Sequence, residues 1–545
     1  MKLLLAFIGM FLIVLNANAL TDQEKQKIIE TIYQKIYNAS SDKGIAPSLK
    51  FDTYKARQIA YMMKDRDGKP MIGFESKAFE VCEKFGNRRD DAIALLLGHE
   101  ISHHIMRHHW GKEFRSAYSI GELEKEIKDL DKGNALKFET QADENGGILC
   151  FMAGYDTGGL AEELLKELYK AYNIQDSPKY PSLAERIKIA KTQDSLVQTY
   201  IKVFETANYA LMIQEYDIAI RCFDWVTTKF QSREIYNNYG VALFLKGIEE
   251  SDPDDIKYIY PIELDLESKI NARGLKGMGD DVKALFEKSI EMFEKAVDRD
   301  KKFLTGKLNI ACAYSVLSNF RKAKNYAEDV IYDADKTKDK YTILNAKLVL
   351  AIINDIDENG DKGKSKQILD DLISQGHLLA EMNQQLMEGE DISEIEILAM
   401  PLKWMDGSMP KLEQPKYPKR ESLTGLSKYS MSALQNEIPN GAEEQLKFGR
   451  DDQILIANFD DSRLYFIPGD KFILFHATKN NYTGTTEQGI KLGSTKDEVL
   501  SKYGAPGSVN TTKQGLILSY PKNKLLVLIG HENTVTRWIV WRGDL

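Results

Sequence analysis

The spacing of apolar and polar residues predicts a long helical part followed by a shorter part rich in strands. Near the start, residues 22–38 carry four isoleucines at helical spacing, and Thr21 is a suitable N-cap for that helix. Residues 71–74 form a short apolar run that we expect to be a strand at the edge of a sheet. Helical spacing then returns between Asp90 and Trp110, where Asp90 and Asp91 suit a first helical turn.

Between residues 200 and 385 the pattern is helical and repeats. Small and apolar side chains recur at a spacing of 34 residues, first as Ser289, Phe293 and Ala296 and then as Ala323, Ala327 and Val330. This spacing is typical of tetratricopeptide-like repeats, which we favour over an irregular helical bundle. The charged stretch from Ser251 to Asp280 interrupts the array. Three or more such repeats form a concave surface suited to peptides or protein partners.

The last part of the chain carries strand signals. Residues 386–440 are rich in proline and glycine and read as a linker. Short alternating runs follow at 453–459, 463–466 and 471–477, and later at 516–520, 525–529 and 535–541. Between these two groups, Thr495 and Glu498 form a capping box at the start of a helix that ends before Pro506. Residues 485–545 resemble the small SmpA/OmlA-like module of envelope lipoproteins, which implies binding or scaffolding.

Length and charge exclude several classes of protein. A chain of 545 residues is too long for one hydrophobic core, so we expect several domains. Charged residues make up 28% of the chain and the mean hydropathy is -0.39, which is typical of a water-soluble protein. The net charge of -9 and the absence of a basic block argue against a nucleic-acid partner.

The first 19 residues have the pattern of a secretory signal. Lys2 precedes an apolar run from Leu3 to Leu15, and Ala17-Asn18-Ala19 offers small residues at a cleavage site. The run is shorter than the roughly 20 residues that span a bilayer, so we expect cleavage after Ala19 rather than a retained anchor. The mature protein is then periplasmic or secreted, with no stable membrane span.

Four cysteines, Cys82, Cys150, Cys222 and Cys312, are widely scattered and form no Cys-x-x-Cys pair. Four buried thiols are the favoured interpretation. Cys82 and Cys150 fall in one predicted domain, and a disulfide between them in an oxidising compartment stays open.

The candidate chemistry lies in His99-Glu100-Ile101-Ser102-His103. Two histidines four residues apart fall on one face of a helix and can direct their nitrogens at one Zn²⁺. A carboxylate at Glu100 would lie beside that ion, where it could take a proton from a water that zinc activates. The pattern predicts one zinc ion per chain, bound by His99 and His103.

A catalytic zinc site needs a third protein ligand, and Glu139 is the best candidate. Glu139 and Asp143 are one helical turn apart, so the first could bind zinc while the second accepts a hydrogen bond from a ligand histidine. Ala142 and Gly146 lack bulk, which would let their helix approach the zinc helix closely. The competing residues Glu122, Glu124, Glu126 and Glu144 have the pattern of solvated helix charges.

With these residues in place, a resemblance to a known family appears. His99 to His103, followed by Glu139-x-x-Ala142-Asp143-x-x-Gly146, resembles the zinc metallopeptidases that include CAAX prenyl endopeptidases, HtpX-like proteases and BepA-type envelope proteases. The resemblance covers about residues 50–195. It implies an α+β, mostly helical, zincin-like domain of the gluzincin type. It also implies that Glu100 is the general base, that Glu139 completes the ligand set, and that Asp143 supports a ligand histidine.

One segment departs from the family pattern. Members usually carry His-Pro followed five residues later by arginine, and here the corresponding residues are Tyr180, Pro181 and Arg186. A phenol can donate a hydrogen bond to a developing oxyanion, so Tyr180 has either that catalytic role or a packing role. Arg186 is expected to form a structural ion pair, for instance with a carboxylate of the same domain.

Together these features predict a multidomain chain. Its expected parts are a signal peptide (1–19), a zinc metallopeptidase domain (20–199), tetratricopeptide-like repeats (200–385), a linker (386–440), a β-rich segment (441–484) and the SmpA/OmlA-like module (485–545). The predicted function is an exported zinc metalloendopeptidase that hydrolyses envelope or secreted polypeptides, with repeats that recruit substrates or envelope partners. The alternative is a non-catalytic or latent chaperone-like assembly protein with a structural metal site.

Overall fold

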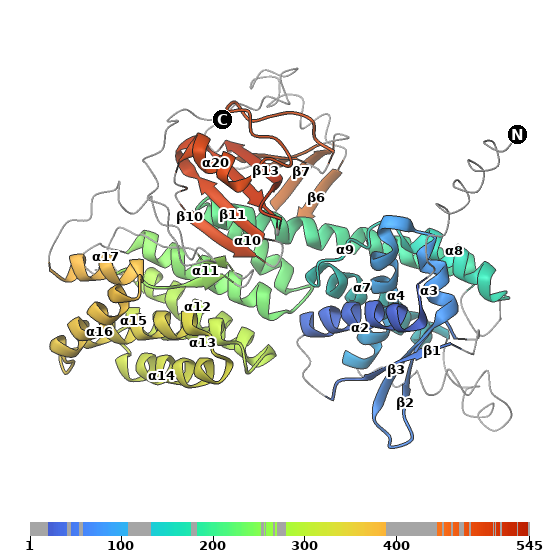
Figure 1. Ribbon diagram of the computed structural model, residues 1–545, viewed down its shortest axis with the longest axis horizontal. Coiled ribbons are helices and arrows are strands. Elements are labelled where there is room, and N and C mark those ends of the chain that lie inside the picture. The colour runs from blue at the N-terminus through green and yellow to red at the C-terminus, as the bar shows by residue number, and fades with distance from the viewer. Residues whose placement is uncertain are drawn as a thin grey trace, which may run out of the picture. The chain divides into compact units, whose positions relative to one another are not determined.

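A computed structural model gives the fold of the chain (Figure 1). It describes residues 20–40, 45–53, 58–106, 132–175, 182–251, 256, 258–264, 268–269, 280–388, 444–448, 452–458, 462–467, 473–478, 481–504, 506, 508–512, 515–530 and 532–542. The chain divides into two compact units, Met1–Ile201 and Lys202–Leu545. The described residues are mostly helical, with a separate β-rich region at the C-terminal end, as the sequence predicts.

The helices of the first unit follow the apolar spacing of its sequence. They are α2 (Asp22–Ala39), α3 (Ser76–Glu83), α4 (Arg89–Ile105), α7 (Lys132–Met152) and α8 (Ala161–Tyr172), and α9 (Leu183–Met212) begins in this unit. The predicted cap of α2 is confirmed. The Thr21 side chain accepts a hydrogen bond from the Glu24 amide, and the Glu24 carboxylate accepts one from the Thr21 amide. Helix α4 ends at Ile105, and residues 107–110 of the predicted helix lie outside the described part.

A three-stranded sheet belongs to the same unit. Its strands are β1 (Ser48–Asp52), β2 (Ala60–Lys64) and β3 (Pro70–Glu75), in the order β1-β3-β2. The strand predicted at residues 71–74 is present within β3, but the prediction that it is an edge strand was wrong. It pairs in parallel with β1 on one side and antiparallel with β2 on the other, so it is central. Strand β2, an edge of this sheet, contacts α4.

Helices α4 and α7 cross at two glycines. A Cβ added at Gly146 would stand 2.8 Å from the Gly98 carbonyl carbon, and one added at Gly98 would stand 2.8 Å from the Gly146 carbonyl oxygen. Ala142, one turn before Gly146, is fully buried. The prediction that small residues let the two helices approach closely is therefore confirmed, and this approach fixes the separation of the side chains that project from them.

The second unit opens with a series of helices that pack in sequence order. After α9 they are α10 (Tyr216–Thr227), α11 (Arg233–Glu250), α12 (Asp280–Arg299), α13 (Leu304–Val316), α14 (Phe320–Thr337), α15 (Lys340–Ile356), α16 (Lys362–Ser374) and α17 (Leu378–Met387). All six residues of the 34-residue repeat are fully buried in α12 and α14. The residues between α11 and α12 carry the short hairpin of β4 (Glu263–Leu264) and β5 (Ser268–Lys269).

Alternate helices of this series also contact one another. Helix α13 contacts both α11 and α15, and α15 also contacts α17. We call these four helices, α11, α13, α15 and α17, the inner layer. Because each inner helix touches the next inner helix as well as its sequence neighbours, the layer presents a continuous surface.

The C-terminal strands form one eight-stranded sheet. They are β6 (Glu444–Phe448), β7 (Asp452–Asn458), β8 (Ser462–Ile467), β9 (Ile473–Thr478), β10 (Ser508–Thr512), β11 (Gly515–Tyr520), β12 (Leu525–Ile529) and β13 (Val535–Arg542). Their order is β10-β11-β12-β13-β9-β8-β7-β6, so antiparallel pairing of β13 with β9 joins the two groups that the sequence analysis treats separately. Helix α20 (Lys496–Tyr503) has the predicted capping box and packs on this sheet through Val499 and Tyr503.

All four cysteines are buried as free thiols, which confirms the favoured interpretation. Burial raises the pKa of the Cys82 and Cys150 thiols, so both stay protonated and unreactive at neutral pH. Within the part of the chain that the structure describes, no helix is both long and apolar enough to cross a bilayer. The predicted signal peptide (1–19), Tyr180 and nearly all of the predicted linker lie outside that part.

Candidate metal centre

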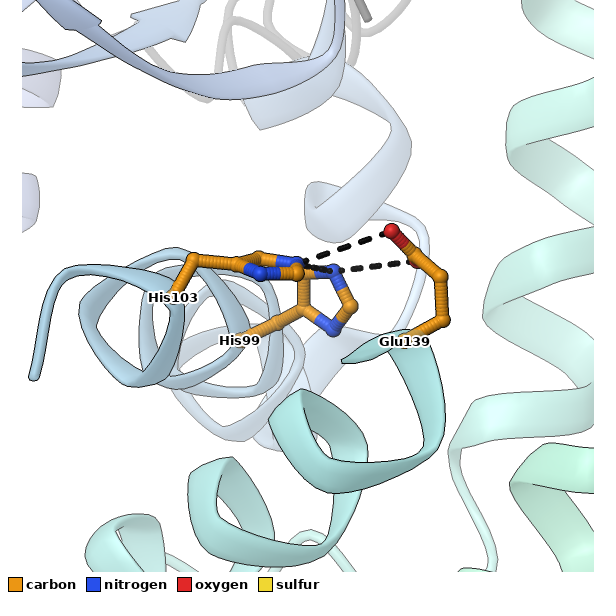
Figure 2. A group of neighbouring side chains, drawn as sticks. All are labelled: His99, His103 and Glu139. Atoms are coloured by element: carbon orange, nitrogen blue, oxygen red, sulfur yellow. Dashed lines mark hydrogen bonds and ion pairs between the residues drawn. The ribbon is translucent and has the colours of Figure 1, made fainter. Parts of the chain in front are cut away.

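Two helices bring together three side chains that could hold a metal ion. His99 and His103 project from successive turns of α4, and Glu139 projects toward them from α7, as Figure 2 shows. One ligand atom from each lies within 4.8 Å of the other two. His103 is buried, while His99 and Glu139 are partly buried. The three predicted zinc ligands are therefore adjacent, although Glu139 is 36 residues further along the chain than His103.

The spacing of the three groups fits a tetrahedral ion. The Nε2 atoms of His99 and His103 are 3.0 Å apart, and they lie 3.4 and 3.6 Å from the two Glu139 carboxylate oxygens. Zinc bonds of about 2.0–2.1 Å place tetrahedral ligand atoms about 3.3 Å apart. The three separations lie within a few tenths of an ångström of that value, with each histidine measured to a different carboxylate oxygen, so the three side chains are close enough to share one Zn²⁺ after small side-chain adjustments. Two nitrogens and a carboxylate are also a donor set that zinc accepts.

Asp143 orients the first histidine. Its Oδ1 lies 2.7 Å from His99 Nδ1, and an ionised carboxylate can only accept a hydrogen bond there. The Nδ1 atom therefore carries the proton, which leaves Nε2 as the ring nitrogen that faces His103 and Glu139. This is the arrangement of a ligand histidine supported from behind by a carboxylate. It matches the role that the sequence analysis expects of Asp143.

Arg186, near the start of α9, supplies the positive charge opposite these carboxylates. Its Nη1 atom forms a very short ion pair with Glu139 Oε2, and its Nη2 atom lies 3.9 Å from Asp143. Burial alone would raise the pKa of the Glu139 carboxyl, but the Arg186 guanidinium and then His99 hold that pKa well below its usual range. Glu139 is therefore ionised at neutral pH, which a carboxylate ligand requires. The expected structural ion pair of Arg186 is thus with Glu139.

The carboxylates act on His99 in the opposite direction. Burial tends to lower the pKa of this imidazole, but the hydrogen bonds and charges of Asp143 and Glu139 outweigh that effect and raise it to about 10. The metal-free site thus attracts a positive charge to the point between His99 and Glu139. A divalent cation at that point would be stabilised by the same negative charges.

Of the other two predicted site residues, the structure describes only Glu100. Glu100 follows His99 on α4 and is partly exposed. It lies next to the ligand pair along the helix, as a general base in this motif must. Tyr180 is outside the described residues, so its predicted roles stay predictions.

The sequence analysis missed strand β2, which contacts the helix that carries both histidines. In the described part of the sheet, β2 pairs with β3 along one side only. A signal for it exists in the sequence, because Asp65 to Gly68 has the composition of a hairpin turn between two apolar runs. In the structure the Asp65 side chain accepts from the amides of Asp67 and Lys69 in that turn.

Comparisons with known proteins give no further guide. No family model matches the chain, and searches of curated proteins and of solved structures find no match to it.

Proposed function

We propose that the chain is an exported zinc metalloendopeptidase that hydrolyses peptide bonds in envelope or secreted polypeptides. The single observation that carries the proposal is the meeting of His99, His103 and Glu139 at separations of 3.0–3.6 Å, close to those of ligands on one zinc ion. Glu100, adjacent to the first of them, supplies the carboxylate that hydrolysis needs. The resemblance of the motif and its spacing to the CAAX endopeptidase, HtpX and BepA group supports the same reaction.

The chemistry of the site follows from its donor set. Bound there, Zn²⁺ would polarise a scissile carbonyl and lower the pKa of a water molecule to about 7. Glu100 would accept the proton of that water and pass it to the leaving amine. Asp143 holds His99 in the tautomer that binds metal, and Arg186 keeps Glu139 ionised. Tyr180, if it faces the site, would donate a hydrogen bond to the oxyanion.

Strand β2 is a suitable support for the substrate. It is an edge strand that contacts α4, and an extended peptide can pair with such an edge through backbone hydrogen bonds that are independent of side-chain identity. We therefore assign to β2, rather than to residues 71–74 of the central strand, the role of holding an extended substrate. The helical series would act as tetratricopeptide-like repeats that recruit substrates or envelope partners.

The test compares wild type with Glu100→Gln, after secretion and removal of the signal peptide. We expect both proteins to hold one zinc per chain, because residue 100 is not a ligand. Cleavage of a casein-like substrate should fall by about 10²- to 10⁴-fold in the variant, the usual contribution of a general base. Glu80→Gln, which changes an exposed glutamate on α3, is the matched control and should cleave at the wild-type rate.

Elemental analysis and casein cleavage together separate the proposal from its alternative. Cleavage by Glu100→Gln at the wild-type rate would refute the assignment of the base. A wild-type protein that binds zinc and cleaves nothing would favour the alternative, an assembly protein with a structural metal site. A protein without zinc would overturn both.

A further inference from the structure

One long connection in the helical series returns to the surface of the inner layer. The other connections between α9 and α17 have two to five residues, whereas α11 and α12 are separated by residues 251–279. Within that connection, Tyr258-Ile259-Tyr260-Pro261-Ile262 is neither helix nor strand and is buried, with exposed fractions of 1–6% for its tyrosines and isoleucines. We call residues 258–262 the inner segment. Most connections in compact domains have about 4–6 residues, so a connection of this length is uncommon.

The inner segment is held by its backbone. The Ile259 amide donates to Asn383 Oδ1 at 2.8 Å, and Asn383 Nδ2 donates to the Ile259 carbonyl oxygen at 2.9 Å. One side-chain amide on α17 therefore satisfies both polar groups of one residue, as a neighbouring strand would. Such a contact recognises an extended chain without regard to its side chains.

The two tyrosines of the inner segment are held by their hydroxyls. The Tyr258 hydroxyl donates to Asp355 on α15 in a very short hydrogen bond, and the Tyr260 hydroxyl is 3.1 Å from Ser315 Oγ on α13. The Tyr260 ring packs edge-on against Phe244 of α11, with centroids 6.3 Å apart. Asn383, Asp355, Ser315 and Phe244 thus contact the inner segment from one inner-layer helix each.

A repeated asparagine shows what is unusual about Asn383. Asn238, Asn309, Asn345 and Asn383 are each the sixth residue of their helix. The first three pair with side chains, since Asn238 donates to Asn208, Asn309 donates to Asn237 and Asn345 contacts His377. Asn383 instead binds the main chain of a non-helical segment. The same buried position therefore contacts side chains in three helices and the backbone of the inner segment in the last.

We propose that the inner layer is a binding surface for an extended polypeptide in which two tyrosines flank an aliphatic residue, and that the inner segment occupies this surface as a built-in competitor. Proline at the fourth position suits such a ligand, because it restricts the chain to extended conformations and needs no amide partner. The inference extends the recruiting role in the proposed function to a specific partner chemistry. It does not depend on the metal centre.

Tethering sets the expected size of the competition. If an isolated copy of the segment binds with a Kd on the order of 10 μM, an effective concentration of the tethered copy on the order of 1 mM would weaken its binding by about 100-fold. A free peptide should therefore bind poorly to wild type and well to a variant whose own segment has lost its rings.

The probe is a fluorescent peptide with the sequence of residues 256–264, and binding is followed by anisotropy in the full chain. The Glu100→Gln background prevents cleavage, so that a failure here is independent of the enzymatic proposal. Tyr258→Ser/Tyr260→Ser, called the opened variant, should bind the probe up to about 100-fold more tightly than the parent. Adding Asn383→Ala should weaken that binding by about tenfold. A peptide with both tyrosines replaced by serine is the matched control and should not bind.

Two outcomes would overturn the proposal. The parent and the Tyr258→Ser/Tyr260→Ser variant, the opened variant, could bind the probe equally well, or a folded opened variant could fail to bind the probe. Hydrogen exchange in the unmodified chain decides the case if the opened variant does not fold. A displaceable segment exchanges its Ile259 amide faster than the core amides of α13, through local opening. If the Ile259 amide exchanges only when the whole chain unfolds, the inner segment is a permanent part of the core, and the inference is overturned.

Discussion

Arg186 and three ionisable groups determine what the metal centre can bind. Arg186 pairs with Glu139, Asp143 accepts from His99, and His99 faces Glu139. Two carboxylates oppose one guanidinium, so the metal-free cluster stabilises one further positive charge. In the metal-free protein that charge is a proton on His99, which is why the pKa of His99 is raised to about 10. A metal ion must displace this proton, since only the neutral imidazole is a ligand.

Zinc binding should therefore be stronger at higher pH. Below a pKa of about 10 the metal-free His99 holds the proton that zinc must release, so the apparent affinity should rise by about tenfold per pH unit between pH 7.5 and 9. Calorimetric titration of the metal-free protein in buffers of different ionisation enthalpy counts the protons. We expect about one proton released from His99 in this window. A binding heat that is the same in every buffer would contradict the raised pKa.

The crossing of α4 and α7 is the element on which the ligand geometry depends. Gly98 and Gly146 meet backbone to backbone, where no side chain can yield to relieve an overlap. The ligands on both helices lie within two turns of this contact. A separation of the helices by one further ångström would lengthen the histidine-to-carboxylate distances, now 3.4 and 3.6 Å, well beyond the roughly 3.3 Å spacing of tetrahedral zinc ligands.

Gly146→Ala should push the helices apart. Its Cβ would stand 2.8 Å from backbone atoms of both Gly98 and His99, and such overpacking usually costs about 1–3 kcal/mol. We expect a lower unfolding midpoint in denaturant and zinc affinity reduced by at least tenfold. Gly147→Ala is the matched control, because the atoms nearest to its Cβ belong to the Val197 side chain, at 3.2 Å or more, and not to the backbone of α4. Equal zinc affinity in both variants would show that the glycine contact does not set the ligand spacing.

Across the whole molecule, metal binding should stabilise one unit directly. All three candidate ligands belong to residues 1–201, whereas the inner layer and the eight-stranded sheet belong to residues 202–545. A ligand at 100 times its Kd stabilises the folded state that binds it by about 2.7 kcal/mol. The metal ion would stabilise the second unit only if stabilisation of the first unit were passed on to it through the chain.

Hydrogen exchange with and without zinc tests this division. Amides of α4 and α7 should exchange about 10- to 100-fold more slowly when zinc is bound, because local opening there releases the ion. Amides of α13 and α14 should exchange at the same rate in both states. Equal slowing in the two units would show that they unfold together.

Local signals in the sequence predicted what neighbouring residues determine. The caps at Thr21 and at Thr495, the helix that carries His99 and His103, and the buried triplets of α12 and α14 all follow from residues within a few turns of each other. Their physical causes are amide capping and apolar spacing, which act within one element. Ala142 and Gly146 also predicted a close contact between helices, because the size of a side chain can be read directly from the sequence.

Only the tertiary structure decided which distant groups meet. It placed β3 at the centre of its sheet, because β1 and β2 both pair with it, and it joined β9 to β13 across two segments that look separate in the sequence. It also brought Asn383 to the backbone of Ile259, 124 residues away. Strand edges and side-chain amides can pair with many partners, and no local pattern selects among them. The arrangement of the whole chain decides, because it must pair most of the buried polar groups at once.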